Sequence, residues 1–285
     1  MKNTLNIGGK ILSLNQPLIM GILNTTPDSF YKDSRFNPNQ ETFLKKAEAM
    51  IHDGAHLLDV GGYSTRPGGS EVSEAEELER VIPAVEQLTA HFPGTPVSVD
   101  TFRAGVAREA LKAGAVMVND VSGGDFDPAM FPLIIEKKPV YILMHQEGHS
   151  VADMHTTGHH KELLPGVFDK LFKKAAYLRS RGVADIILDP GFGFSKSQEE
   201  NYQLLQHLEL LQNDHYPLLA GMSRKSMIWK LLRITPEEAL PYSLYLHGLA
   251  VLKGAKIIRV HDPRAHADIL QINRQFKLSL PYNNF

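Results

Sequence analysis

The segment Ile186-Ile187-Leu188-Asp189 is a short apolar run that ends at a carboxylate, and the same pattern occurs eight times along the chain. The other seven runs, each with the polar residues that end it, are Leu18–Leu23 with Asn24, His56–Leu58 with Asp59, Val97–Val99 with Asp100, Val116–Val118 with Asn119, Val140–Met144 with His145, Leu218–Gly221 with Ser223 to Lys225, and Lys256–Ile258 with Arg259. Nearly continuous apolar runs are typical of parallel strands that are buried on both faces. Eight such strands predict an α/β fold of the (β/α)8 TIM-barrel type, with the active site at their carboxyl ends.

Helical patterns separate the apolar runs. The predicted helices are Glu41–Asp53, Ser73–Phe92, Ala104–Ala113, Phe168–Arg181, Glu199–Leu211, Ser226–Leu232, Pro236–Lys253 and His266–Lys277. Ser73 is a predicted N-cap, because Glu76 follows it at capping-box spacing. Leu5–Leu14 alternates apolar and polar residues around Gly8-Gly9, which predicts an N-terminal β-hairpin covering the bottom of the barrel. A doubly wound sheet is the alternative fold, but no dinucleotide or P-loop motif follows the first strand.

Length and composition limit the classes of protein. The chain has 285 residues, and a TIM barrel uses about 250, so residues 1–285 are predicted to form one domain. Lys plus Arg is 30 and Asp plus Glu is 32, for a net charge of −2, which argues against a broad basic surface for nucleic acid or membrane. The absence of cysteine excludes disulfides and thiolate chemistry. With no predicted signal peptide or membrane span, the expected location is cytoplasmic.

Three of the strand ends carry hydrogen-bonding groups of complementary kinds. Asp100, Asn119 and Asp189 each end a different run, so barrel geometry would bring them around one pocket. Two carboxylates and an amide can accept and donate along the edge of a flat heterocycle. The alternative is that each caps the helix that follows it. Phe192 and Phe194, just after Asp189, could stack on a ring or belong to the core.

The last two strand ends carry positive charge. Lys225 follows the seventh run, and a lysine at that depth needs an acceptor or an anion beside it. Arg259 and His261 are two residues apart on the eighth strand, so they point the same way. A cation and an imidazole fit a phosphate group, and this corner of the barrel is a common phosphate site. The alternative is an ion pair with Asp262 or with glutamate side chains.

Three loops leave both a functional and a plain interpretation open. Asn24 could supply a neutral oxygen to a cation that is held chiefly by phosphate, or it could belong to a turn. The glycine-rich loop at 61–69 could close on an anion or be a surface Ω-loop. The region at 145–165 holds His145, His149 and three further histidines, and a solvated loop is favoured over a metal site.

Taken together, these motifs resemble the dihydropteroate synthase family over nearly the whole chain. The matching motifs are Met20–Asn24 with Thr26–Phe30, Asp59 with Gly61-Gly62 and Ser64–Gly68, Ser98–Thr101, Asn119–Gly123, Met144-His145, Asp189–Phe194, Ser223–Ser226 and Arg259–Asp262. The resemblance implies a folate-biosynthesis transferase that condenses 6-hydroxymethyl-7,8-dihydropterin diphosphate with 4-aminobenzoate. It also implies Mg2+ as cofactor and a homodimer formed through barrel helices, for which Leu244–Leu252 is the candidate surface.

The resemblance also assigns roles to residues. The pterin-binding residues it implies are Asp100, Asn119, Met144, Asp189, Phe194, Gly221, Lys225 and Arg259. Those for phosphate are Arg259 and His261; those for 4-aminobenzoate are Phe30, Thr65, Arg66, Pro67, Lys225 and Ser226; and the metal ligand is Asn24. Lys225, Arg259 and Asp189 would be catalytic.

The sequence departs from the family pattern in places. After Phe30 the family usually continues Ser-Asp-Gly-Gly, whereas this chain has Tyr31-Lys32-Asp33-Ser34, so either Lys32 or Asp33 occupies the place of a loop aspartate. Two other functions stay open: a methyltransferase acting on methyltetrahydrofolate, and a non-catalytic pterin-binding barrel. Lys225 and the Arg259–His261 phosphate corner favour the synthase.

Overall fold

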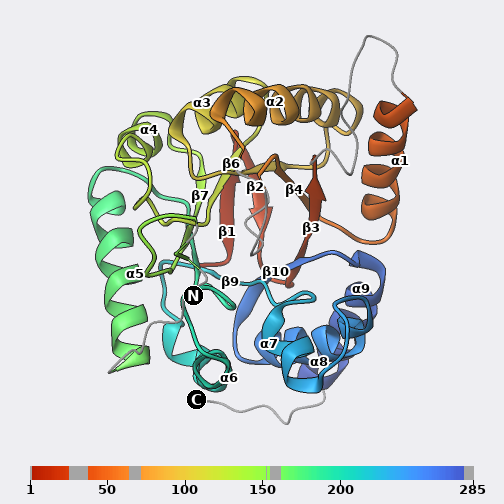
Figure 1. Ribbon diagram of the computed structural model, residues 1–285, viewed down its shortest axis with the longest axis vertical. Helices are drawn as coiled ribbons and strands as arrows, with labels where there is room; N and C mark the ends of the chain where they lie inside the picture. Colours follow the sequence, from red (N-terminus) through yellow and green to blue (C-terminus); the bar gives the residue numbers. More distant parts are fainter. Residues whose placement is uncertain (1, 26–37, 64–71, 152, 155–161, 279–285) are drawn as a thin grey trace.

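The computed structural model contains a closed barrel of eight parallel strands surrounded by helices (Figure 1). It describes residues 2–25, 38–63, 72–151, 153–154 and 162–278. The strands are β3 (Leu18–Asn24), β4 (Leu57–Gly61), β5 (Val97–Asp100), β6 (Met117–Asp120), β7 (Val140–Met144), β8 (Ile186–Asp189), β9 (Leu218–Ala220) and β10 (Ala255–Val260). They pair in chain order, and β10 closes the ring against β3. The predicted barrel is therefore confirmed.

Helices follow the strands around the outside of the barrel (Figure 1). Their bounds are α1 Pro38–His52, α2 Glu74–His91, α3 Ala104–Lys112, α4 Met130–Lys137, α5 Leu163–Ser180, α6 Gln198–Gln206, α7 Ser226–Leu232, α8 Leu240–Leu252 and α9 Pro263–Leu278, with 3-10 turns η1 Leu208–Leu211 and η2 Glu237–Ala239. The predicted capping box is present: Ser73 Oγ accepts the N–H of Glu76, and Glu76 Oε2 accepts that of Ser73.

Helices α4 and α5 differ most from the prediction. Helix α4 was not predicted, because it is short and Pro132 lies in its first turns, a residue that usually argues against a helix. Helix α5 begins at Leu163 instead of Phe168. Pro165 and Gly166 obscured this start, although proline is tolerated in a first helical turn, where the N–H has no intrahelical partner.

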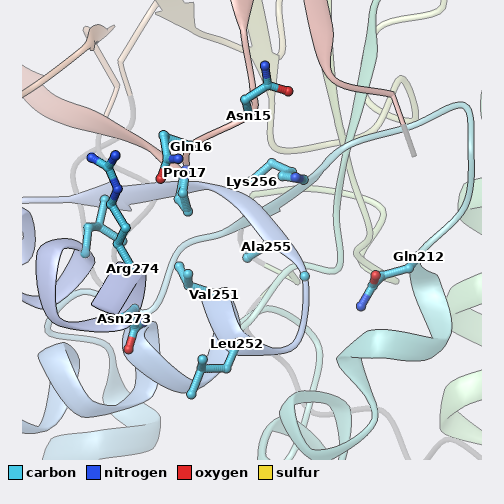
Figure 2. Close-up of a pocket in the computed structure, with 12 residues that line it drawn as sticks. Asn15, Gln16, Pro17, Gln212, Val251, Leu252, Ala255, Lys256, Asn273 and Arg274 are labelled. Atoms are coloured by element: carbon cyan, nitrogen blue, oxygen red, sulfur yellow. The ribbon is translucent and has the colours of Figure 1, made fainter. Parts of the chain in front are cut away.

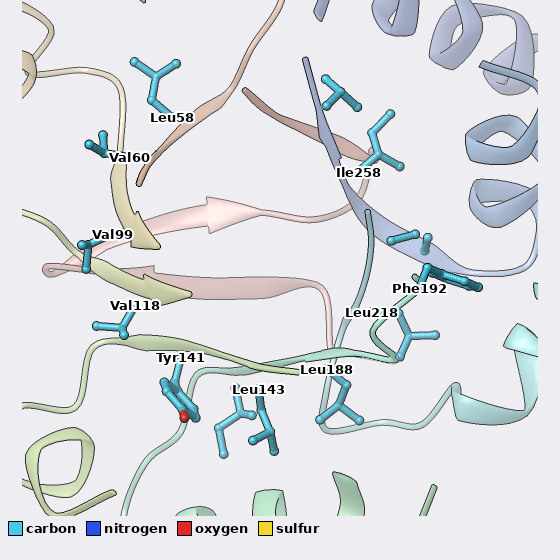
Figure 3. Close-up of a cluster of buried hydrophobic side chains, with 14 of the residues drawn as sticks. Leu58, Val60, Val99, Val118, Tyr141, Leu143, Leu188, Phe192, Leu218 and Ile258 are labelled. Atoms are coloured by element: carbon cyan, nitrogen blue, oxygen red, sulfur yellow. The ribbon is translucent and has the colours of Figure 1, made fainter. Parts of the chain in front are cut away.

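The strands alternate between an outward and an inward side chain. Leu58, Val60, Val118 and Tyr141 point away from the barrel into the layer beneath the helices (Figure 3). The residues between them point inward, so that Leu57 lies in the central core and Asp59 lies one step nearer the carboxyl end. This period of two aligns the inward positions of neighbouring strands into layers.

The N-terminal hairpin covers the amino end of the barrel. Strands β1 (Thr4–Ile7) and β2 (Lys10–Ser13) pair antiparallel. Leu5 and Leu14 are fully buried against the inward-facing residues Met20, Leu57, Met117, Val140, Ile142, Ile187, Leu219 and Ile257. The predicted cover is thus confirmed, and it directs chemistry to the opposite end. Among the described residues, no helix is long and apolar enough to cross a membrane.

Replacing Leu5 should destabilise the barrel without altering its opposite end. Leu5→Ala removes a fully buried side chain and should lower the free energy of unfolding by about 3 kcal/mol. The matched control on the same hairpin is Ile11→Ala, because Ile11 is 69% exposed and its loss should change stability by less than about 0.5 kcal/mol. Urea unfolding measures both, and equal losses would contradict the packing of the hairpin.

Candidate functional site

A cavity of about 620 Å³ opens at the carboxyl ends of the barrel strands. The predicted site residues that line it are Asn24, Asp100, Asn119, Met144, Asp189, Phe194, Gly221, Lys225, Ser226, Arg259 and His261. They come from most of the barrel strands and the loops that follow them. Four further predicted residues, Phe30, Thr65, Arg66 and Pro67, lie outside the described residues, as do Lys32 and Asp33.

A second, smaller cavity of about 320 Å³ lies at the amino end of the barrel (Figure 2). Asn15 to Pro17, which precede β3, and Ala255 and Lys256, which begin β10, line it together with residues of α8 and α9. None of the predicted site residues is among those that line it. The candidate functional site is therefore the larger cavity.

Arg259 connects two carboxylates across the barrel. Its Nε donates to Asp59 Oδ2 and its Nη2 donates to Asp100 Oδ2, each at 2.6 Å. Asn119 Nδ2 also donates to Asp59 Oδ2, at 2.9 Å. Burial raises the pKa of Asp100 to about 7, against the lowering effect of Arg259. Burial lowers the pKa of Arg259, but Asp59 and Asp100 outweigh it, so Arg259 stays charged.

Asp189 is held at the rim of the same cavity by the turn that follows it. Its Oδ1 accepts the N–H of Gly191 at 2.8 Å. Gly191 has a φ of +71°, and a Cβ there would come within 2.0 Å of the His145 carbonyl oxygen, so only glycine fits. Burial raises the pKa of Asp189, while the nearby Lys225 and the Gly191 N–H lower it.

Two lysines converge on the loop after β8. Lys225 donates to the carbonyl of Phe192, and its Nζ lies 4.4 Å from the centre of the Phe194 ring. Lys196 Nζ lies 3.1 Å from His145 Nδ1 and 3.1 Å from each of the carbonyl oxygens of Gly191 and Phe194. Burial lowers the pKa of Lys225 to about 8 and that of Lys196 to about 7.

His261 and the loop after β9 form the opposite corner. Ser223 Oγ accepts the backbone N–H of His261 at 3.2 Å and lies 3.0 Å from its Nδ1. When the Ser223 hydroxyl donates to Nδ1 of the neutral ring, Nε2 carries the proton and can donate to an anion. Arg224 makes two hydrogen bonds to Asp262, each at 2.9 Å.

Several of the plain interpretations do not describe the site. Asp100 pairs with Arg259, Asn119 binds Asp59, and Asp189 accepts a turn N–H; none of these hydrogen bonds caps a helix. The expected alternative of an ion pair between Arg259 and Asp262 is wrong, since Arg259 reaches across the barrel to Asp59 and Asp100.

The prediction of a solvated loop is wrong for His145, which is buried. Its Nδ1 lies beside Lys196, and its Nε2 lies 2.9 Å from Glu147 Oε1. Burial, together with the charge of Lys196, lowers its pKa to about 4, so it is neutral at physiological pH. Among the residues that the structure describes, no three His, Cys, Asp or Glu side chains converge as a metal site.

Sequence reasoning missed Asp59 and Lys196 as site residues. Asp59 is fully buried beneath the cavity. Its place at the end of an apolar run marks it as a candidate, but the sequence assigns it no binding or catalytic role. Lys196 follows Phe194 by two residues and is 5% exposed. Nothing in the sequence marks it as buried, because a lysine in a Gly-Phe-Ser-Lys loop is ordinarily exposed.

Comparisons with known proteins point to one family. A family profile described as "Pterin binding enzyme" matches residues 20–261. The dihydropteroate synthase of Bacillus subtilis is 40% identical over 263 residues, which is 92% of this chain and 87% of that protein. A Yersinia pestis dihydropteroate synthase solved as a sulfonamide drug complex has a TM-score of 0.89 and 38% identity, covering 97% of this chain and 100% of that one. The Burkholderia cenocepacia dihydropteroate synthase complexed with 7,8-dihydropteroate has a TM-score of 0.87 and 37% identity, with 97% of each chain covered.

Removing the guanidinium of Arg259 should change how stability depends on pH. In the native protein the raised pKa of Asp100, about 7 against an ordinary value of 3.8, means that the folded state binds more protons between these values. Stability therefore falls as pH rises through this window. Arg259→Met raises the pKa of Asp100 further, so stability continues to fall as the pH rises to higher values. At neutral pH the free energy of unfolding of the variant should be lower by about 3–5 kcal/mol.

Unfolding in urea at about pH 6 and at about pH 9 measures this dependence. Arg108→Met is the control, because Arg108 forms an exposed pair with Glu136 at 3.1 Å, and loss of such a pair costs about 0–1 kcal/mol. If Arg259→Met behaves as Arg108→Met does, the bridge across the barrel contributes nothing to stability.

Proposed function

The chain belongs to the dihydropteroate synthase family of pterin-binding enzymes, and we propose how the residues of its large cavity carry out the family's reaction. That reaction is a transferase step of folate biosynthesis: 6-hydroxymethyl-7,8-dihydropterin diphosphate and 4-aminobenzoate condense to 7,8-dihydropteroate, with release of pyrophosphate. The observation that supports the assignment of roles best is the gathering of Asp100, Asn119, Asp189, Lys225 and Arg259 around one cavity.

The pterin ring is proposed to lie with its nitrogen-rich edge against Asp189. The ionised carboxylate of Asp189 can accept two parallel N–H bonds, which suits the amino-pyrimidine edge of a pterin. Asn119 and Asp100 lie at the same level of adjacent strands and offer an amide and a carboxyl group to the neighbouring ring atoms. Met144 pairs with Asp189 across β7 and β8, so its side chain can form an apolar wall beside the ring.

Lys225 is proposed to bind the oxygen and nitrogen acceptors of the pterin and to orient the incoming amine. Its ammonium lies beside the face of Phe194, which limits its motion while leaving donors for a ligand. Gly221 leaves space here, because a Cβ on it would lie 3.7 Å from Arg259 Cβ and 4.0 Å from Lys225 Nζ. The two cations thus flank a gap that a ring can enter.

Arg259 and His261 are proposed to bind the diphosphate. The hydrogen bonds of Arg259 to Asp59 and Asp100 use Nε and Nη2, and Nη1 carries two more N–H groups that can reach a phosphate oxygen. Positive charge beside the leaving group favours breaking of the C–O bond, with the electron pair passing to pyrophosphate. The resulting pterin cation is captured by the neutral arylamine, whose nitrogen then loses one proton.

The residues present fit a Mg2+ ion that is held mainly by substrate. Asn24 lines the cavity with a neutral oxygen, and Mg2+ commonly takes only one or two protein ligands beside phosphate and water. The lack of a three-ligand cluster among the described residues agrees with such a site. When bound, the ion would neutralise charge on the diphosphate.

The second substrate, 4-aminobenzoate, is proposed to bind near Lys225 and Ser226, at the start of α7. Both residues line the outer part of the cavity. Phe30, Thr65, Arg66 and Pro67 remain proposed members of this site. The Yersinia pestis relative is described as a sulfonamide drug complex, and we propose that the same class of compound competes for this site here.

A homodimer and a cytoplasmic location are also proposed. Within Leu244–Leu252, the side chains of Tyr245 and Leu252 are 66% and 38% exposed. On the neighbouring α9, Ile272 and Phe276 are 62% and 54% exposed. Large apolar side chains on adjacent helices suit a self-complementary interface with a second copy of the chain.

The purified protein should form 7,8-dihydropteroate and pyrophosphate from the two substrates with Mg2+, and chelation of the metal should lower the rate. Asp189→Asn removes one acceptor from the pterin edge and should reduce kcat/KM about a hundredfold. Asp185→Asn is the matched control, because Asp185 precedes the same strand at its amino end and pairs with Lys2.

Absence of product with folded wild-type protein would overturn the assignment. Methyl transfer from methyltetrahydrofolate would then favour the methyltransferase, and pterin binding alone would favour the non-catalytic barrel. An unchanged kcat/KM in Asp189→Asn would remove that residue from the proposed pterin site.

Sedimentation velocity should give a dimer for the wild-type chain. Tyr245→Glu places a charge in the proposed interface and should shift the protein toward the monomer. Tyr177→Glu is the control, because Tyr177 on α5 is 45% exposed and α6 lies between α5 and α8 around the barrel (Figure 1). A wild-type monomer, or equal effects of the two variants, would contradict the proposed surface.

A further inference from the structure

Two buried histidines lie behind the phosphate corner, and the proposed reaction does not use them. His247 on α8 and His266 on α9 are both 0% exposed. Their rings are 4.9 Å apart between centroids. The two helices pack side by side next to β10 (Figure 1).

The two imidazoles are links in one chain of hydrogen bonds. The backbone N–H of Met222 donates to His247 Nε2 at 3.0 Å. His247 Nδ1 lies 2.9 Å from His266 Nε2, and His266 Nδ1 lies 2.7 Å from the carbonyl oxygen of Asp262. We call this series, from Met222 through both histidines to Asp262, the histidine relay.

The direction of every bond in the histidine relay follows from its first donor. A backbone N–H can only donate, so His247 Nε2 must be the acceptor and the ring proton must be on Nδ1. That proton is donated to His266 Nε2, which places the proton of His266 on its own Nδ1. This proton is donated to the Asp262 carbonyl, so all positions are satisfied only when both rings are neutral.

A further proton would oppose this arrangement. Burial lowers the pKa of His247, and Lys225 and the neighbouring imidazoles of His266 and His261 lower it too, against the carbonyl of Ala220. Burial likewise lowers the pKa of His266, with Arg224 acting the same way and Asp262 opposing. Both rings are therefore neutral at physiological pH, as the bond directions require.

The relay joins the loop that carries Lys225 to the loop that carries His261, one of the two diphosphate-binding groups. Met222 precedes Ser223 and Lys225, while Asp262 follows His261. On the cavity side the same loops are joined by the contact of Ser223 with His261. Arg224 pairs with Asp262. The backbone N–H of Arg224 also donates to Ser243 Oγ on α8.

We propose that His247 and His266 are positioning residues that fix the spacing of the Lys225 and His261 loops and so set the affinity of the diphosphate subsite. This inference rests on the proposed function for the identity of the anion. The relay does not touch substrate; it acts through the two loop backbones that it joins. A purely structural role, in which the histidines only hold α8 against α9, is the competing explanation.

The test compares the relay with another hydrogen bond between the same two helices. Asn273 on α9 donates to the carbonyl of Gly248 on α8 at 3.0 Å, so Asn273→Ala weakens helix packing without touching either loop. His266→Leu and His247→Leu should raise the Kd for pyrophosphate and the KM for pterin diphosphate about tenfold.

A conservative variant of His247 separates the effect of its hydrogen bonds from the effect of its side-chain volume. His247→Gln supplies an amide oxygen for the Met222 N–H and an amide N–H for His266, so its Kd for pyrophosphate should stay within about threefold of the wild-type value. Asn273→Ala should lower Tm and leave the Kd unchanged. If His266→Leu lowers Tm as Asn273→Ala does, with unchanged Kd and KM, the histidines only pack helices and the proposal is wrong.

A measurement on the unaltered protein keeps the proposal falsifiable if a leucine variant fails to fold. Two-bond proton–nitrogen NMR should show His247 and His266 as neutral Nδ1–H tautomers near pH 7. A charged ring or an Nε2–H tautomer at either position would overturn the relay. Failure of the wild-type protein to bind pyrophosphate or form product would instead overturn the proposed function, whatever the tautomers are.

Discussion

The ion pairs of Arg259 with Asp59 and Asp100 are the interaction on which the site depends. A guanidinium in the middle of a barrel is costly to bury unless carboxylates meet it, and burial of Asp100 without a cation would favour its protonated form. The charge of Arg259 and the carboxylates of Asp59 and Asp100 therefore stabilise one another. Asn119 completes the cluster through its bond to Asp59, so a polar floor replaces the apolar core at this level of the barrel.

The rest of the fold makes that floor possible. Inward positions recur every second residue, so the apolar layer of Leu57 and its neighbours ends one step below Asp59. The hairpin buries Leu5 and Leu14 at the other end, which supplies hydrophobic stabilisation where no charge is needed. Burial at the amino end and charge at the carboxyl end are therefore two parts of one arrangement.

The fold and the described part of the site follow from the sequence where a local pattern is repeated. Eight apolar runs with polar ends predicted the strands, and parallel register then places Asp100 beside Asn119. What the sequence did not reveal depends on tertiary burial. Lys196 resembles a surface lysine until the loop after β8 folds over it, and His247 and His266 meet only when α8 packs on α9. The helix containing Pro132 was missed because it is short, although its proline lies in the first turn, where the N–H has no intrahelical partner.

The electrostatic balance of the cavity explains why lysines of lowered pKa suit a diphosphate substrate. Burial brings the pKa of Lys225 to about 8 and of Lys196 to about 7. A fraction of each lysine is therefore uncharged near neutral pH before substrate binds. An entering anion favours the protonated ammonium, and positive charge therefore increases when the diphosphate binds. Lys225 also opposes the charging of His247, which ties the neutrality of the histidine relay to the positive charge that the substrate requires.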